Sequence, residues 1–319
     1  MPKRKKGQKT RLQEIATGSP VTWINVTDPD EALLLKTLKS KYPFFLEMDL
    51  RDCLPPFQRP KLLEREQYLF MVLLFPIYDQ SRRTVLPYEV DFFIGKDFLV
   101  TSHRGTHETL TQLAEACGAG SDSCVLRHDD NALRLALDVV HGLVVSCFPL
   151  VTSLSNDLIA MEQRIFDEES DGTVVKDMLR LKTSVVGFRE AMQGYENVMK
   201  KLMDRGHRLF PVDELRAQYE DIAGHGREIW AFLENDRDTV NALADAHLTL
   251  ATHKTNHAMK TLTALAFIIF PMNLVAAIFS MDAKGTPFSG QPNDFWMMLS
   301  VIFATMLTVV LFLKKKRWL

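Results

Sequence analysis

Catalytic motifs are missing from the sequence. It contains no glycine-rich phosphate loop, no Gly-x-Ser-x-Gly nucleophile elbow and no His-Glu-x-x-His zinc motif. An excess of charge of one sign is missing too, because 38 lysine and arginine residues stand against 40 aspartate and glutamate residues, for a net charge of −2. We therefore expect that the protein is not an enzyme, has no covalently bound cofactor and has no nucleic-acid partner.

Cysteine is scarce, with four residues in a chain of 319. Cys53, Cys117, Cys124 and Cys147 form no Cys-x-x-Cys pair and share no metal-type spacing with histidine. In a cytoplasmic domain, such cysteines are expected to be reduced and to fill the core. The pattern indicates no redox role.

Two long uncharged runs lie near the C-terminus. Residues 262–281 and 295–313 contain no charged side chain. About 20 residues at 1.5 Å per residue cross the roughly 30 Å of hydrocarbon in a bilayer, so each run predicts a transmembrane helix. Because the connection is short, the two helices must form a hairpin with both chain ends on the same side. The alternative is a buried helical hairpin of a soluble protein.

Basic residues predict the orientation of this hairpin. Lys-Lys-Lys-Arg at 314–317 follows the second run, and Lys254 and Lys260 precede the first. Positive residues mark the cytoplasmic side, so we expect a multi-pass protein of the plasma (inner) membrane with both termini in the cytoplasm. The basic segment 3–11 has no apolar core and does not resemble a signal peptide. It is interpreted as a solvated tail, with nucleic acid or lipid headgroups as alternative partners.

One face of the first membrane helix carries polar side chains. Its positions follow alternating spacings of four and three, which keep to one helix face. They are Asp245, Thr249, Thr252, Asn256, Met259, Thr263, Ala266, Phe270, Asn273, Ala277 and Ser280. An amide facing lipid is costly, so Asn273 should face protein or water. Several copies of this stripe around an axis would enclose an ion path; the alternative is a helix–helix seam with small residues at close contacts.

Residues 21–103 read as mixed α/β structure. Runs of apolar and β-branched residues predict strands at 21–26, 67–78, 84–95 and 96–103. Asp-Pro-Asp at 28–30 is expected to begin a helix after the first strand. Three strands in succession predict an antiparallel segment with helices on its faces.

The pattern becomes helical from about residue 131. We predict two long helices at 131–168 and 173–204 and a third that begins at Asp213 and continues into the first membrane span. Gly224 and Gly226 are candidates for a bend or break in this third helix.

Three places outside the stripe could attract metal ions. The acidic junction at 167–172 could concentrate cations, although a solvated helix–helix turn has the same composition. His103 and His107 lie close in sequence, but no third ligand is evident. His253 and His257 lie four residues apart on the third helix, beside the stripe rather than on it.

The chain resembles the CorA family of divalent-cation channels and transporters over most of its length. The strongest likeness is Thr-Asn-x-x-Met-Lys-x-Leu-Thr at 255–263, followed by Pro271 and the hairpin with its basic tail. Weaker likenesses are Trp-Ile at 23–24, Arg-Pro-Lys at 59–61 and the strand end at 100–103.

This resemblance implies a CorA-like, funnel-shaped homopentamer in a lipid bilayer. Each subunit would have an α+β cytoplasmic domain in α/β/α layers, followed by long helices and a C-terminal two-helix transmembrane hairpin. The corresponding domains are a basic disordered tail at 1–18, the α/β domain at 19–125, two long helices at 126–208, a stalk helix with the first span at 209–281, an outer loop at 282–294, the second span at 295–313 and a basic cytoplasmic tail at 314–319.

The resemblance also assigns roles to single residues. Taken with the stripe, it implies a pore and gate lined by Asn256, Met259, Leu262, Thr263, Ala266, Phe270, Asn273, Ala277 and Ser280. The metal-binding positions that it implies are Asp282, Asn273, Asp245 and Asp221. The last of these matches a position at which family members bind regulatory magnesium between neighbouring cytoplasmic domains.

The family signature Gly-Met-Asn reads Ser280-Met281-Asp282 in this chain. A pentamer would then carry five carboxylates at its outer mouth, and tight binding there would slow conduction. The implied function is transport of divalent metal cations. Mg²⁺ is the expected ion, with Co²⁺, Ni²⁺ or Zn²⁺ as alternatives, and the same ion is expected to act as a regulator. The altered signature leaves open a non-conducting homologue that senses metal or scaffolds a partner, and a zinc-exporting or proton-coupled member.

Overall fold

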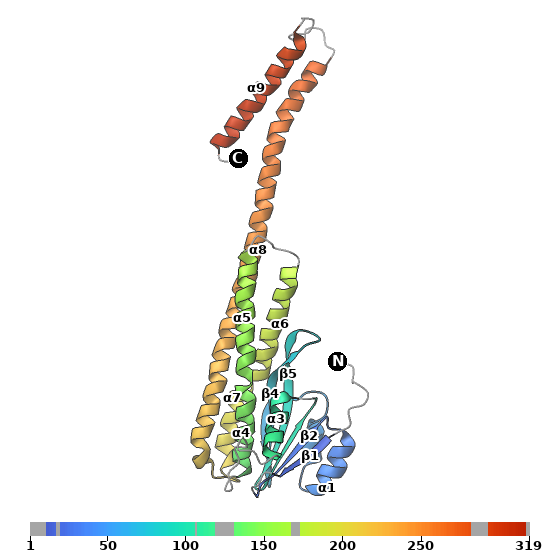
Figure 1. The fold of residues 1–319 in the computed structure, drawn as a ribbon, viewed down its shortest axis with the longest axis vertical. Coiled ribbons are helices and arrows are strands. Elements are labelled where there is room, and N and C mark those ends of the chain that lie inside the picture. Colours follow the sequence, from blue (N-terminus) through green and yellow to red (C-terminus); the bar gives the residue numbers. More distant parts are fainter. Residues whose placement is uncertain are drawn as a thin grey trace. The chain divides into compact units, whose positions relative to one another are not determined.

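The computed structural model of the protein describes residues 11–16, 20–105, 107–118, 131–166, 173–281 and 293–316 (Figure 1). They belong to two compact units, one within residues 1–243 and one within residues 244–319. The first unit contains a sheet with helices, and the second contains two apolar helical segments. The sequence predictions for Asp282, for Cys124, for the acidic junction at 167–172 and for most of the basic segment 3–11 fall outside the described residues.

A six-stranded mixed sheet lies at the centre of the first unit. Its strands are β1 (Arg11–Ala16), β2 (Thr22–Thr27), β3 (Lys61–Glu64), β4 (Tyr68–Asp79), β5 (Thr84–Gly95) and β6 (Phe98–His103). They lie in the order β1-β2-β6-β5-β4-β3, and β2 and β6 run parallel while the other neighbours run antiparallel. The antiparallel segment predicted over residues 67–103 is confirmed by the pairing of β4, β5 and β6.

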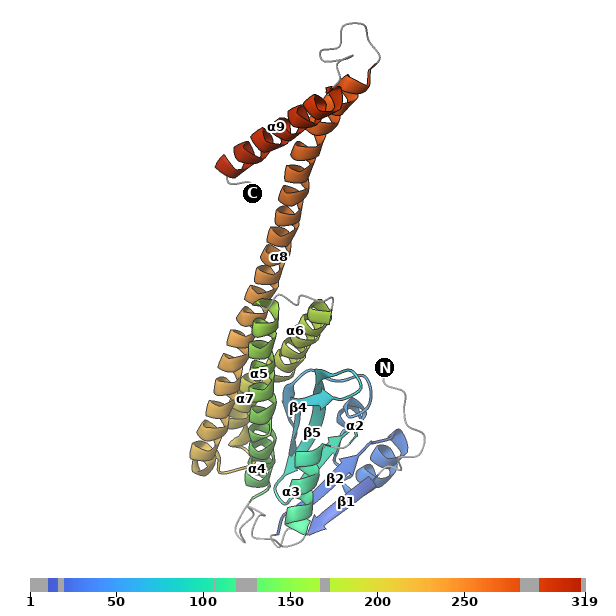
Figure 2. The same ribbon diagram turned by 45° about the horizontal axis from the view of Figure 1, so that its top comes forward.

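Helical segments cover both faces of this sheet. They include η1 (Leu33–Leu38), α1 (Lys39–Lys41), α2 (Glu47–Asp52) and α3 (Glu108–Gly118). The segments η1 to α2 pack on one face, where the Phe45 ring stacks on Phe93 of β5 at a centroid distance of 4.6 Å. Helices α3, α4 and α6 pack against the sheet as well (Figure 2). Residues 68–76 of β4 are all buried, as expected for a strand covered on both faces, so the predicted α/β/α layers are confirmed.

The two long helices expected at 131–168 and 173–204 are each divided in two. The helices are α4 (Ala132–Val145), α5 (Cys147–Phe166), α6 (Thr173–Met192) and α7 (Tyr195–Gly206). Pro149 explains the first break, because a proline has no N–H and its ring clashes with the carbonyl four residues earlier, which belongs to Val145. The second break is at Gly194, where an added Cβ would lie 2.4 Å from Pro60.

Helix α8 (Arg216–Ser280) is continuous, in contrast to α4–α7. It follows a 3₁₀ turn, η2 (Val212–Leu215), close to the predicted start at Asp213. It is not interrupted at Gly224, Gly226 or Pro271, so the expected break at the glycines is absent. The second apolar run forms α9 (Asp294–Lys315).

Three described helical segments are long and apolar enough to cross a membrane. In segment 132–166, half of the most apolar 18-residue stretch is buried in the first unit, so this segment contributes to the core of that unit. In the most apolar 18-residue stretches of α8 and α9, only 6% of the residues are buried within the chain. Two exposed apolar helices contradict the buried hairpin of a soluble protein and agree with a membrane hairpin.

The cysteines follow the prediction only in part. Cys53 and Cys147 are free and buried, as expected for core-filling residues. Cys117 is disulfide-bonded, so the expectation that all cysteines are reduced is wrong. Cys124 lies outside the described residues.

Candidate functional site

The polar stripe of α8 is accessible in the single chain. Of its eleven positions, ten are exposed and Ala266 is half-buried. The apolar side chains in and beside its middle are among the most exposed of the protein, with Met259 at 62%, Leu262 at 68% and Phe270 at 74%. Such large exposed apolar side chains indicate a surface that contacts lipid, another copy of the chain or a pore interior.

The stripe lies on the face of α8 that its own hairpin leaves free. Apart from Ala266 on the stripe itself, the shielded positions in this part of α8 are Ala264, Ile268, Pro271, Met272, Val275 and Ala276. Helix α9 starts near the end of α8, turns back and diverges from it towards the C-terminus (Figure 1). Each residue turns a helix by about 100°, so Pro271 and Val275 point about 100° and 140° away from Phe270. The stripe is therefore available for contacts beyond the single chain.

Hydroxyl groups along the stripe present acceptor oxygens. Thr249, Thr252 and Thr263 each donate their hydroxyl proton to the backbone carbonyl four residues earlier, at 2.9, 2.8 and 2.7 Å. The Ser280 hydroxyl donates to the carbonyl of Ala277 at 2.9 Å. Because the proton is engaged, the oxygen lone pairs remain free to accept hydrogen bonds from water around a cation. The stripe thus has acceptor oxygens at both ends, and its mainly apolar segment between them, from Met259 to Phe270, contains one hydroxyl, that of Thr263.

The predicted metal ligands lie in different parts of the chain. Asn273 and Asp245 are exposed on the stripe, in the second unit. Asp282 lies outside the described residues, whereas Ser280 and Met281 of the same signature are described and exposed. Asp221 belongs to the first unit, on the part of α8 that packs against other helices. Their roles as metal ligands stay predictions.

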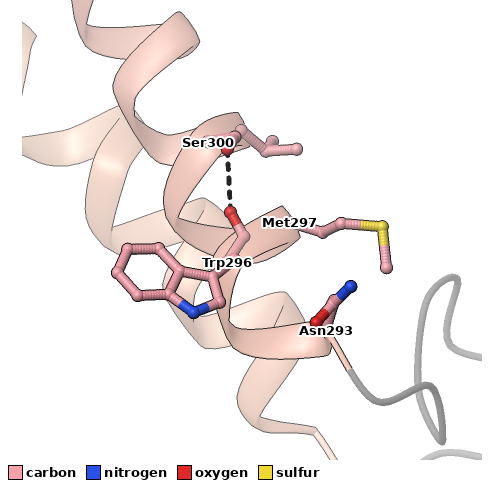
Figure 3. A pocket seen from close by; sticks show the side chains of 5 residues that line it. Asn293, Trp296, Met297 and Ser300 are labelled. Carbon is pink, nitrogen blue, oxygen red and sulfur yellow. Dashed lines mark hydrogen bonds between the residues drawn. The ribbon is translucent and has the colours of Figure 1, made fainter.

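The start of α9 carries an open pocket lined by Asn293, Trp296, Met297 and Ser300 (Figure 3). The Ser300 hydroxyl donates to the carbonyl of Trp296 at 2.8 Å, so it is engaged within the helix. The Trp296 ring is 66% exposed. Tryptophan at the end of a membrane span sits at the boundary between lipid and water, so this region fits a membrane anchor better than a binding site.

His103 and His107 are buried parts of the first unit. His103 Nδ1 lies 2.6 Å from the Tyr88 hydroxyl, and its Nε2 lies 3.1 Å from Asn25 Oδ1. Burial lowers the pKa of both histidines to about 4, which keeps them neutral at pH 7. Within the described residues they belong to no cluster of three metal-ligating side chains. The hydrogen bonds of His103 fit a structural role better than a zinc site.

A different pair of histidines meets Asp221, one of the predicted metal ligands. His141 of α4 and His225 of α8 place ligand atoms within 4.8 Å of each other and of Asp221. Neither histidine was predicted from the sequence, because α4 and α8 are far apart in the chain and only folding brings them together. The predicted pair His253 and His257 is exposed on α8 and has no such third partner among the described residues.

Asp236 links α8 to α5. Its two carboxylate oxygens each lie 3.0 Å from the hydroxyl of Ser155, which donates to them. The side chain is only 3% exposed, and burial raises the pKa of its carboxyl. A buried carboxylate without a partner is costly, so this contact specifies how α5 and α8 pair.

Two known bacterial proteins are similar to this chain over most of its length. YfjQ of Bacillus subtilis is 25% identical over 300 residues, which cover 93% of this chain and 89% of YfjQ. The cobalt/magnesium transport protein CorA of Thermotoga maritima is 24% identical over 307 residues, which cover 94% of this chain and 84% of that protein.

The fold is shared with a solved transporter. The complete structure of the CorA magnesium transporter from Methanocaldococcus jannaschii superposes with a TM-score of 0.81 at 19% identity, over 94% of this chain and 92% of that one. The family model for the CorA-like Mg²⁺ transporter protein matches residues 18–316. The chain therefore belongs to the CorA-like Mg²⁺ transporter family.

Proposed function

We propose that the protein transports divalent metal cations across the plasma membrane through a central pore lined by α8. Membership of a family of channel-like transporters, which are not enzymes, supports transport. The observation that carries the proposal is the exposed stripe of α8, which has polar ends and an apolar centre and lies away from α9.

The proposed path begins at the outer mouth with Asp282. It then passes Ser280, Ala277 and Asn273, crosses the gate formed by Phe270, Ala266, Thr263, Leu262 and Met259, and leaves along Asn256 and Asp245. A narrow ring of Met and Phe side chains blocks a hydrated ion by dewetting, whereas rings of amide and hydroxyl oxygens hold its water shell. Conduction then requires the apolar rings to widen.

Magnesium is the ion that the stripe favours. Apart from the Met259 thioether, the ligand groups of the stripe are amide, hydroxyl and carboxylate oxygens, and it contains no histidine or cysteine. Mg²⁺ prefers oxygen and gives up its water reluctantly, so it suits a path that binds the hydrated ion. Co²⁺, Ni²⁺ and Zn²⁺ are the competing ions to test.

The proposed assembly is a homopentamer in the inner membrane, with both termini of each chain in the cytoplasm. One exposed stripe cannot enclose a path, so several copies of α8 must surround a common axis. The basic residues Lys314, Lys315 and Lys316 at the end of α9 support the orientation. In this assembly Mg²⁺ acts as the cargo and as a regulatory ion.

Uptake by proteoliposomes tests the proposal. Purified protein is reconstituted, and entry of Mg²⁺, Co²⁺, Ni²⁺ and Zn²⁺ is followed for the unaltered protein and for Asp282→Asn. We expect uptake by the unaltered protein and a changed rate or selectivity in Asp282→Asn, because the change removes the carboxylates from the outer mouth. If Asp282→Asn left rate and selectivity unchanged, the role of Asp282 would be wrong.

A second candidate function is a non-conducting homologue that senses metal or scaffolds a partner. The observation that favours it is Ser280-Met281-Asp282 in place of the family signature. The same liposomes discriminate between the two functions. Uptake only after Asp282→Asn would mean that the carboxylates trap ions and that bulk transport is not the native role. No uptake by either protein would favour the sensor or scaffold.

A further inference from the structure

Three metal-ligating side chains of the first unit converge between α4 and α8. They are His141, Asp221 and His225, and their ligand atoms lie within 4.8 Å of one another. His141 Nε2 lies 3.7 Å from Asp221 Oδ2, and the two imidazole centroids are 5.5 Å apart. Asp221 and His225 are four residues apart on α8, a spacing that puts both side chains on one helix face.

Neighbouring contacts fix the helices around this cluster and one of its side chains, His225. The side chain of Gln218 donates a hydrogen bond to Asp138, which joins α8 to α4 within one turn of the cluster. The Phe148 ring meets the His225 ring edge-on at a centroid distance of 5.6 Å. The Tyr195 hydroxyl donates to the Ile222 carbonyl at 3.4 Å and fixes α7 against the same turn of α8. The contacts around the cluster therefore come from α4, α5, α7 and α8, while the Asp221 side chain itself remains exposed.

One nitrogen of the cluster lacks a partner. His225 Nδ1 is buried and accepts or donates no hydrogen bond within the described residues. Leaving a buried polar atom unpaired costs free energy, so native structures usually supply a partner. A metal ion held by the cluster would engage His225 and make this arrangement favourable.

The donor set indicates which metal fits. Two imidazoles and one carboxylate, with one open position, match a four-coordinate site for Zn²⁺ or a related transition metal. Imidazole suits Zn²⁺, Co²⁺ and Ni²⁺, whereas Mg²⁺ takes oxygen ligands in an octahedral arrangement. Ligand atoms of a tetrahedral site lie roughly 3.3 Å apart at metal–ligand distances of about 2.0–2.1 Å. Small side-chain rotations would close the present spacing to this value.

We propose that His141, Asp221 and His225 of a single chain bind one transition-metal ion, of the class of Zn²⁺, Co²⁺ and Ni²⁺. This site differs from the magnesium position that the family resemblance implies for Asp221, because both imidazoles come from the same chain and select another class of metal. The bound ion ties α4 to α8, the helix that continues into the first membrane span. Binding at this site does not depend on the proposed transport function.

Cobalt absorption tests the proposal directly. The full-length protein in detergent is titrated with Co²⁺, whose visible absorption intensifies in a four-coordinate site, and bound Co²⁺ is then displaced with Zn²⁺ or Mg²⁺. We expect one such Co²⁺ per chain, displacement by Zn²⁺ and none by a large excess of Mg²⁺. His141→Asn and His225→Asn should each weaken binding at least about tenfold. Equal binding by the variants and the unaltered protein, or displacement by Mg²⁺, would overturn the proposal.

Two further variants test whether the metal lies at this cluster. The double variant His253→Asn, His257→Asn removes the other histidine pair of α8 and should leave the absorption unchanged; loss of the signal in this variant would place the metal elsewhere. Asp221→Asn removes an exposed ligand, so it should fold normally and still lose affinity. Its thermal unfolding without metal should match that of the unaltered protein, and Zn²⁺ should raise its melting temperature less. If Zn²⁺ raised the melting temperature of Asp221→Asn as much as that of the unaltered protein, Asp221 would not be a ligand of the bound metal.

Discussion

At the scale of single residues, two glycines of α8 have different surroundings. An added Cβ at Gly226 would lie 2.5 Å from the ring of Tyr195, whereas nothing lies within 4 Å of one at Gly224. The Tyr195 ring is 3% exposed, and its hydroxyl is hydrogen-bonded to α8, so it has little room to move. Gly226 therefore permits the close approach of α7 and α8, and Gly224 does not contribute to it.

This difference predicts opposite effects of the same substitution. Gly226→Ala should lower the free energy of unfolding by about 1–3 kcal/mol, because the methyl group overlaps the ring. Gly224→Ala should raise it by up to about 1 kcal/mol, since alanine is the better helix former and the site is open. Denaturant unfolding of the first unit, followed in the full-length protein, measures both. Equal effects of the two changes would contradict the packing of Tyr195 on Gly226.

The buried histidines predict a loss of stability in acid. Burial lowers the pKa of His107 from 6.5 to about 4, so its contribution is complete above pH 6.5 and is lost as the pH falls towards 4. His107 Nδ1 has no hydrogen-bond partner among the described residues, so His107→Leu should change stability little at pH 7. Between pH 6.5 and about 4, the unaltered protein should lose roughly 2–3 kcal/mol more than the variant. Parallel pH profiles of unfolding free energy would show that His107 does not titrate in this way.

At the scale of elements, the pairing of α5 with α8 depends on a buried polar contact. Removing the hydroxyl in Ser155→Ala leaves the Asp236 carboxylate without its hydrogen-bond donor. We expect the free energy of unfolding to fall by about 1–3 kcal/mol. Ser153→Ala is the matched control, because Ser153 is exposed on the same helix. If thermal unfolding showed the same small effect for both variants, Asp236 would not depend on Ser155.

Sequence patterns were sufficient for some elements and not for others. Strands β2, β4, β5 and β6 and the two apolar helices near the C-terminus were predictable, because alternation, run length and charge are local properties. Strands β1 and β3 were not predicted, and β1 lies within the segment 1–18 that was expected to be a disordered tail. The break before α5 was not predicted, although Pro149 is a local signal that could have indicated it. The close approach of Pro60 to Gly194, at the second break, could not be predicted either, because only the fold brings these residues together. For the same reason the sequence pointed to Asp221 but not to His141, its neighbour across two helices.

At the scale of the whole molecule, the central claim is that copies of the α8 stripe surround an ion path. Two adjacent alanines allow a matched test. Ala277 is exposed on the stripe, whereas Ala276 is partly shielded on another face of the same helix turn. The same substitution therefore adds a larger side chain to the ion path at Ala277 and away from the path at Ala276.

Magnesium uptake by proteoliposomes containing Ala277→Leu or Ala276→Leu is the most direct measurement. Both variants should keep the oligomeric mass of the unaltered protein in light scattering; the proposed pentamer predicts five times the 36.4 kDa of one chain. We predict that Ala277→Leu loses most of the uptake, because a ring of larger apolar side chains narrows and dewets the path, and that Ala276→Leu retains it. Equal uptake by the two variants, or loss only in Ala276→Leu, would contradict a pore lined by the stripe.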